Sequence, residues 1–167
     1  TRLATVLLYF GLACYAVLLP LMLFRLCCRG ALPTAAKPTL AILAAPASLG
    51  LAGYLNLVAQ PDYHVLVVLL VLAIMMTGFL YLAFFRLLQL PFSPGYAAFT
   101  FPTVIGATAL FKLAGYIELH GYNPVWVEVL HHLAKVELVV ATAVVAYVAL
   151  HYLVDQVKNQ RGFQVKC

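Results

Sequence analysis

The sequence predicts an all-α integral membrane protein with five transmembrane helices. Of its 167 residues, 65% are hydrophobic and only 9% are charged, and the mean hydropathy is +1.02. A soluble domain carries about 25% charged residues, so this chain has too few polar side chains to cover a surface facing water. Crossing a bilayer as a helix takes about 20 apolar residues. Five runs meet that length and form one membrane region over residues 1–167; they span residues 3–24, 38–59, 65–85, 95–117 and 136–154.

Three of the five runs, 3–24, 65–85 and 136–154, are rich in bulky residues such as Leu, Val, Phe, Tyr and Ile. The first contains no charge. It is also too long for a cleaved signal peptide, and no basic segment of the usual kind precedes it. Bulky apolar surfaces suit contact with lipid, so these three runs are expected to form outer helices.

The run 38–59 is different, because small residues share one of its faces. Ala44, Ser48, Ala52 and Asn56 recur every four residues, which places them on one side of a helix. Pro46 has no N–H to donate to the carbonyl of residue 42, so the pattern predicts a kink inside this helix. A kinked helix with a face of small and polar residues, here called a slim helix, is expected inside a bundle or beside water.

The run 95–117 repeats these features. Pro102 predicts a second kink, and Lys112 is the only charge inside the run. Small and hydroxyl-bearing residues gather on its surface: Thr100, Thr103, Gly106, Ala107 and Thr108. Slim faces also allow two helices to pack closely, so close packing is the alternative interpretation of both stripes. The alternation of bulky and slim helices favours inner helices flanking an axial path, with bulky helices outside.

The charges of the loops predict the orientation. Seven of the ten basic residues fall on one side of the membrane, in the first and third loops and the tail: Arg25, Arg29, Lys37, Arg86, Lys158, Arg161 and Lys166. Basic residues concentrate on the cytoplasmic side. The N-terminus is therefore expected outside, the C-terminus in the cytoplasm, and the chain in the cell (inner) membrane as a multi-pass protein.

Two segments resemble a known family. Pro91-Phe-Ser-Pro-Gly-Tyr-Ala-Ala-Phe-Thr-Phe-Pro-Thr103, followed by Lys112, is similar to the ninth span of the tellurite-resistance/dicarboxylate transporters. Lys37-Pro-Thr-Leu-Ala-Ile-Leu-Ala-Ala-Pro-Ala-Ser-Leu-Gly50 resembles their seventh span. The family includes tellurite-resistance protein A, the fungal malate permeases and the plant slow anion channels. The resemblance covers spans six to ten of ten, so five further spans of the same protein are expected before Thr1.

The resemblance implies a ten-helix bundle of five hairpins around a central pore, assembled as a homotrimer. It implies a channel or transporter for small anions in which a phenylalanine occludes the pore. By motif match that residue is Phe101, with Phe99 as the second candidate. The two slim helices would line the pore through Pro46, Ser48, Ala52, Asn56, Pro102, Thr103 and Gly106.

Anion passage requires a favourable potential without a strong trap. The hydroxyls of Ser48, Thr100, Thr103 and Thr108 and the amide of Asn56 are candidate donors, although hydroxyls in membrane helices often bond to their own backbone instead. Lys112 has two interpretations. It either supplies positive potential at the outer mouth of the pore, or snorkels or pairs with Glu118 or Glu137.

No nucleophile with a paired base, P-loop or dinucleotide motif occurs, so the sequence predicts a non-enzyme without cofactor or nucleic-acid partner. The lipid bilayer and small anions are the expected partners. The alternative function is a membrane redox or haem subunit that uses the outer-side His64 with His131 or His132. The four cysteines have no metal-ligand spacing.

Overall fold

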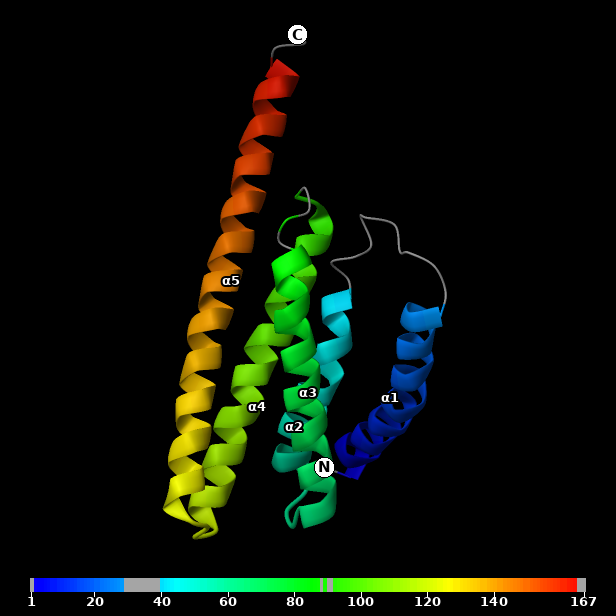
Figure 1. The fold of residues 1–167 in the computed structure, drawn as a ribbon, viewed down its shortest axis with the longest axis vertical. Coiled ribbons are helices and arrows are strands. Elements are labelled where there is room, and N and C mark those ends of the chain that lie inside the picture. Colours follow the sequence, from blue (N-terminus) through cyan, green and yellow to red (C-terminus); the bar gives the residue numbers. More distant parts are fainter. Residues whose placement is uncertain (1, 29–39, 88, 90–91, 165–167) are drawn as a thin grey trace.

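A computed structural model describes residues 2–28, 40–87, 89 and 92–164, and its described elements are all helical (Figure 1). This confirms the all-α prediction. The α-helices are α1 (Arg2–Cys28), α2 (Ala45–Leu57), α3 (Tyr63–Leu87), α4 (Thr100–Leu119) and α5 (Pro124–Gln164). Several residues used above lie outside the described residues: Arg29, Lys37, Pro91, Lys166, Cys167 and the first two positions of the run 38–59.

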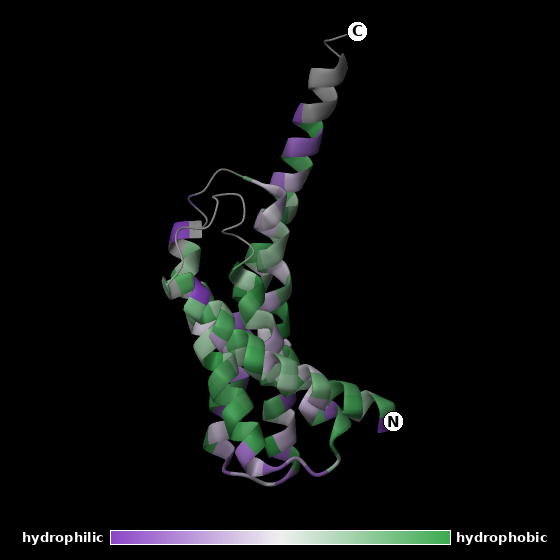
Figure 2. Cartoon of the chain, turned by 90° about the vertical axis from the view of Figure 1, so that its right-hand side faces the viewer, coloured by the Kyte–Doolittle hydropathy of each residue, from purple (hydrophilic) through white to green (hydrophobic). Residues whose placement is uncertain are grey.

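Five helices in the described ranges are long and apolar enough to cross a membrane, which confirms the predicted number. The first four candidate spans lie within three residues of the predicted bounds at each end: Arg2–Leu26, Leu40–Leu57, Tyr63–Phe84 and Pro94–Leu119. Hydrophobic residues cover most of the bundle, as Figure 2 shows, with hydrophilic residues gathered mainly near its ends.

The last helix begins earlier than predicted, at Pro124 rather than at residue 136. Asn123 caps it, because its Oδ1 accepts a hydrogen bond of 2.9 Å from the Val125 N–H. Proline is also well suited to a first helical turn. Charged residues interrupt the apolar run between 124 and 136, so hydropathy alone placed the start of the span too late.

Pro46 and Pro102 do not lie in the middle of α-helices, so the prediction of a proline that interrupts an α-helix is wrong for both. Residues 40–44 form a 3₁₀ segment that leads into α2, and η2 (Pro94–Phe99) is a 3₁₀ helix that leads into α4. Pro46 and Pro102 therefore fall in the first turn of each α-helix, where the α-helical ladder needs no N–H donor. A change from 3₁₀ to α geometry within a span is a recognised site for a hinge.

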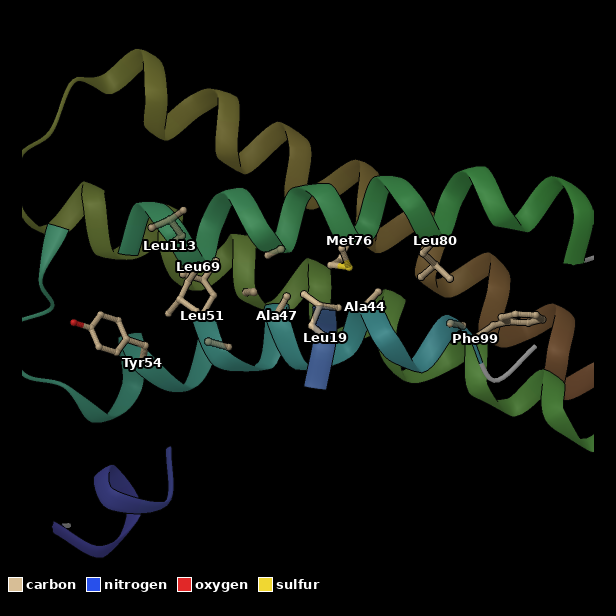
Figure 3. Close-up of a cluster of buried hydrophobic side chains, with 14 of the residues drawn as sticks. Leu19, Ala44, Ala47, Leu51, Tyr54, Leu69, Met76, Leu80, Phe99 and Leu113 are labelled. Carbon is tan, nitrogen blue, oxygen red and sulfur yellow. The ribbon is translucent and has the colours of Figure 1, made fainter. Parts of the chain in front are cut away.

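The inner and outer roles of the helices follow the prediction. The spans containing α2 and α4 have 56% and 50% of their apolar windows buried, against 6%, 22% and 28% for those containing α1, α3 and α5. α2 packs against α1, α3 and α4, while α5 packs along α4. The close-up in Figure 3 shows α2 and α3 side chains such as Leu51 and Leu69 meeting in the core. Figure 2 shows α1 leaning away from the other helices.

Glycines allow α1 to approach α2. A Cβ built at Gly50 would lie 2.7 Å from Leu12 Cδ2, and one at Gly53 would lie 3.1 Å from Leu8 Cδ1. The Tyr15 hydroxyl adds a hydrogen bond of 3.1 Å to the Leu43 carbonyl. These contacts are the small-residue packing typical of membrane helices.

Candidate functional site

One face of α2 and one face of α4 remain without a helix packed on them in the described chain. Leu49 and Asn56 lie seven positions apart on α2, and the α4 residues recur every three or four positions, so each set forms one side of its helix. Ile42 precedes α2, in the 3₁₀ segment 40–44. We call the two sets together the exposed stripe. Its exposed members are Ile42, Leu49, Asn56, Phe101 and Val104, and its half-buried members are Thr108 and Lys112.

A hydrogen bond joins the two halves of the exposed stripe. Lys112 Nζ donates to Asn56 Oδ1 at 2.8 Å, across 56 positions of sequence. Sequence reasoning selected both residues separately but not their pairing. The structure therefore differs from the alternative in which Lys112 pairs with Glu118 or Glu137.

The exposed face of α3 has a different character. Between Val65 and Leu82 its large exposed side chains are apolar: Val65, Val68, Val71, Ile74, Met75, Phe79 and Leu82. The exposed polar side chains of α3, such as His64 and Arg86, lie at the ends of the helix. Such a face matches lipid. The exposed stripe combines apolar residues with a lysine, an asparagine and a threonine, which lipid does not solvate.

The two candidate gate residues occupy opposite environments. Phe101 lies on the exposed stripe and is 53% exposed. Phe99 is 0% exposed, and its ring packs edge-on against Phe84 and Tyr96 with centroid separations of 5.3 and 5.2 Å. Phe99 is thus held in a core of aromatic rings, whereas Phe101 has room to change rotamer.

The threonine hydroxyls bond to their own helices. Thr100 Oγ1 donates to the Ala97 carbonyl at 2.8 Å, and Thr108 Oγ1 donates to the Val104 carbonyl at 2.9 Å. Thr103 Oγ1 lies within hydrogen-bonding distance of two backbone carbonyls, those of Phe99 and Thr100. Each hydroxyl has one hydrogen to donate, so the structure shows the second of the two alternatives weighed for these side chains.

The remaining predicted pore residues lie inside the helix packing of this chain. Pro46 is half-buried at the start of α2. The others are buried: Ser48, Ala52, Pro102, Thr103 and Gly106. In this arrangement they face neighbouring helices, while Asn56 and Phe101 are exposed and Lys112 is half-buried. A small residue serves close packing and pore lining equally well, so spacing alone did not separate the two groups.

Sequence reasoning missed the burial of Glu137, which it considered only as a partner for Lys112 near a span end. Glu137 is 6% exposed, and its Oε1 is buried without a hydrogen-bond partner. It faces Gly106, at the middle of the span Pro94–Leu119. The alternating spacing of three and four along α5 could have revealed it. Glu137 shares one side of the helix with buried Ala134, Ala141 and Val148 and with half-buried Val127, Leu130 and Val144.

Gly106 is the notch that accepts the Glu137 carboxyl. A Cβ built at Gly106 would collide with Glu137 Oε1. We expect Gly106→Ala to lower stability by about 1–2 kcal/mol, the lower part of the range of about 1–3 kcal/mol for overpacking, because the colliding atom ends a flexible side chain. Thermal unfolding of the purified protein in detergent would show this as a lower midpoint.

The double variant gives the sharper result. In a Glu137→Ala background the collision is absent, so Gly106→Ala should become neutral or stabilising because alanine favours a helix over glycine by about 0.5–1 kcal/mol. Gly115→Ala is the matched control on α4, since a Cβ there meets nothing within 4 Å. If Gly106→Ala lowers the stability equally in both backgrounds, then Gly106 does not accommodate the Glu137 carboxyl.

A cavity of about 220 Å³ lies beside Glu137. Its walls come from α2, α3, α4 and α5, and its polar lining residues are Ser48, Thr77, Tyr81 and Glu137. The Tyr81 hydroxyl is buried without a hydrogen-bond partner, like Glu137 Oε1. Two unpartnered polar atoms thus line one largely apolar cavity.

The histidines proposed as haem or metal ligands lie at the periphery. His131 Nε2 lies 3.6 Å from Glu118 Oε2, and His132 Nε2 lies 3.7 Å from Glu128 Oε1. The His64 ring stands edge-on to Tyr63, with centroids 5.8 Å apart. Within the described part of the chain, no three His, Cys, Asp or Glu side chains are grouped so that they could hold a metal ion.

A comparison with known protein families agrees with the resemblance. The family model described as voltage-dependent anion channel (SLAC1) matches residues 2–153, which is most of the chain. Among curated proteins and solved structures, none matches this chain. The chain belongs to the SLAC1 family of voltage-dependent anion channels and is therefore a multi-pass membrane protein of an anion channel or transporter family.

Proposed function

We propose that the exposed stripe of α2 and α4 lines the anion pathway of this protein and that Phe101 occludes it. The observation that carries the proposal is the hydrogen bond between Lys112 and Asn56 on the one face of the inner helices that no described helix covers. Family membership supplies the transported class, since the matching family consists of anion channels.

The lysine supports a pathway rather than a lipid contact. A cation inside an apolar span normally faces a bundle interior or a water-filled cavity, because its transfer into hydrocarbon costs about 2.5–3.5 kcal/mol or more. Lys112 lies seven residues before the end of α4 at Leu119, which corresponds to about 10 Å of helix. Its ammonium therefore supplies positive potential within the membrane, where it attracts an entering anion.

Phe101 supports a closed state. Its ring stands on the exposed stripe near the start of α4. An aromatic ring across a narrow apolar path excludes water, and an anion without water or hydrogen bonds is strongly disfavoured there. The junction between η2 and α4 directly precedes Phe101, so a small change in this junction would move the ring.

The finer predictions from the resemblance belong to the same proposal. Each ten-helix protomer forms its own central pore, and three protomers assemble as a homotrimer. This chain supplies two of the five pore-lining helices, and the cargo is a small inorganic anion or a C4-dicarboxylate. The C-terminus lies in the cytoplasm and the membrane is the inner one. Pro46, Ser48, Ala52, Pro102, Thr103 and Gly106 contribute as the layer behind the exposed stripe, where they set the spacing and tilt of α2 and α4.

Lys112→Met tests the proposal at its central observation. A unit charge about 8 Å from a permeating anion, at an effective dielectric constant of about 40, contributes about 1 kcal/mol, so anion flux should fall about fivefold. The measurement is anion flux or current of the full-length protein reconstituted in lipid vesicles.

Lys135→Met is the matched control, because Lys135 is exposed on α5 away from the exposed stripe. It should leave the flux unchanged within a factor of two. Equal flux for Lys112→Met and the unmodified protein, with both correctly folded, would show that Lys112 does not face the anion pathway.

A further inference from the structure

The Glu137 carboxyl combines three properties that rarely occur together. It is almost fully buried, its Oε1 has no hydrogen-bond partner, and it lies beside Gly106 at the middle of the α4 span. The sequence contains five acidic residues, and the other four lie in loops or towards helix ends: Asp62, Glu118, Glu128 and Asp155.

No cation in the described structure neutralises Glu137. Its titratable neighbour from α3 is Tyr81, which lines the same cavity. The cavity residues from α2 are Ser48 and Leu51, and those from α4 are Gly106, Ala109 and Leu110, none of which is charged. Lys112 of α4 binds Asn56 on the exposed stripe, and Lys135 of α5 itself is exposed.

An isolated carboxylate in such a place is strongly disfavoured, and protonation is the usual remedy. We infer that Glu137 is a proton-binding site in the membrane core, neutral when the helices are packed as described, and that its ionisation suppresses anion passage. The proton site rests on the geometry alone. Its effect on passage rests on the proposed function.

The cavity lies directly beside the carboxyl. Its volume of about 220 Å³ holds several water molecules, and two unpartnered polar atoms line it. Three of its lining residues, Ile74, Leu133 and Val136, are exposed on α3 and α5, so the cavity opens between these outer helices. Water held beside Glu137 would solvate the carboxylate when the proton leaves it.

The sign of the effect follows from charge. Gly106 separates Glu137 from the opposite side of α4, where Val104 and Thr108 belong to the exposed stripe. A carboxylate behind this helix adds negative potential to the pathway at mid-depth, and an anion is repelled by it. Protonation removes the charge, so anion flux should rise as the pH falls.

Two measurements on the full-length protein in lipid vesicles test the inference. The first is infrared difference spectroscopy between acidic and alkaline buffers, which reports the carbonyl stretch of a protonated carboxylic acid. That signal should vanish in Glu137→Gln and persist in Glu128→Gln, because Glu128 is exposed near the start of α5. A signal unchanged in Glu137→Gln overturns the proton site, whatever the transport result.

The second measurement is anion flux across the same pH range. The unmodified protein should lose roughly fivefold in flux from the acidic to the alkaline end, Glu137→Gln should keep the high flux throughout, and Glu128→Gln should behave like the unmodified protein. An equal pH dependence in Glu137→Gln overturns the effect on passage. If no variant carries anions, the proposed function fails while the infrared signal still decides on the proton site.

Glu137→Asp covers the case in which Glu137→Gln does not fold. Aspartate keeps the acid but draws it back from Gly106 by one carbon. The infrared signal of the protonated acid should persist, but the pH at which half of it is lost should shift. The pH at which the anion flux falls by half should shift with it. An infrared signal lost at an unchanged pH contradicts the inference.

Discussion

Replacing Phe101 by alanine is expected to raise the anion conductance of the full-length protein about tenfold or more. The ring is 53% exposed on the exposed stripe, so its removal widens the pathway without removing a core contact. A tenfold change requires the barrier to fall by only about 1.4 kcal/mol. Desolvating an ion in an apolar constriction costs more than that. The measurement is single-channel or ensemble anion current in planar bilayers.

Phe79→Ala is the matched control for Phe101→Ala. Phe79 is an outward-facing phenylalanine on α3 with 42% exposure, and it belongs to the apolar face that suits lipid. Its truncation should leave the current unchanged. If Phe101→Ala and Phe79→Ala both behave like the unmodified protein, then Phe101 does not occlude the pathway. If both variants raise the current equally, the increase follows from the loss of any exposed phenylalanine and not from the removal of a gate.

Phe99→Ala is expected to act on stability rather than on conductance. Phe99 is fully buried and contacts the rings of Phe84 and Tyr96. Its truncation leaves a cavity on the order of 100 Å³, and at about 24 cal/mol per Å³ this costs about 2.4 kcal/mol. The aromatic contacts add about 0.5–1.5 kcal/mol for each ring pair. Thermal unfolding in detergent should show a clearly lower midpoint.

Phe99→Leu separates packing from aromatic contact. Leucine refills most of the volume, so it should recover most of the midpoint but not the part due to the ring pairs with Phe84 and Tyr96. Phe99→Ala should thus lower the unfolding midpoint, whereas Phe101→Ala should raise the anion conductance. A midpoint unchanged in Phe99→Ala would contradict the burial of this ring.

Composition and hydropathy were sufficient for the class of protein and for the number of helices. Lipid leaves few choices, because a spanning segment must satisfy its own backbone hydrogen bonds and must be long enough to cross. The contrast between slim and bulky runs also predicted which helices lie inside. α2 and α4 are the most buried spans, as expected from their small residues. The Phe99-Thr-Phe-Pro102 segment pointed to the correct family before any structural contact was known.

The faces of these helices were decided only by the tertiary structure. Ser48 and Leu49 are neighbours in sequence, yet Ser48 is buried while Leu49 belongs to the exposed stripe. The pairing of Lys112 with Asn56 and the insertion of Glu137 into the Gly106 notch depend on how α4 lies between α2 and α5. A helical period shows which residues share a side, but the neighbour on that side depends on helix placement in three dimensions. In a membrane, a helix face of small residues can equally well pack against another helix or line an anion pathway.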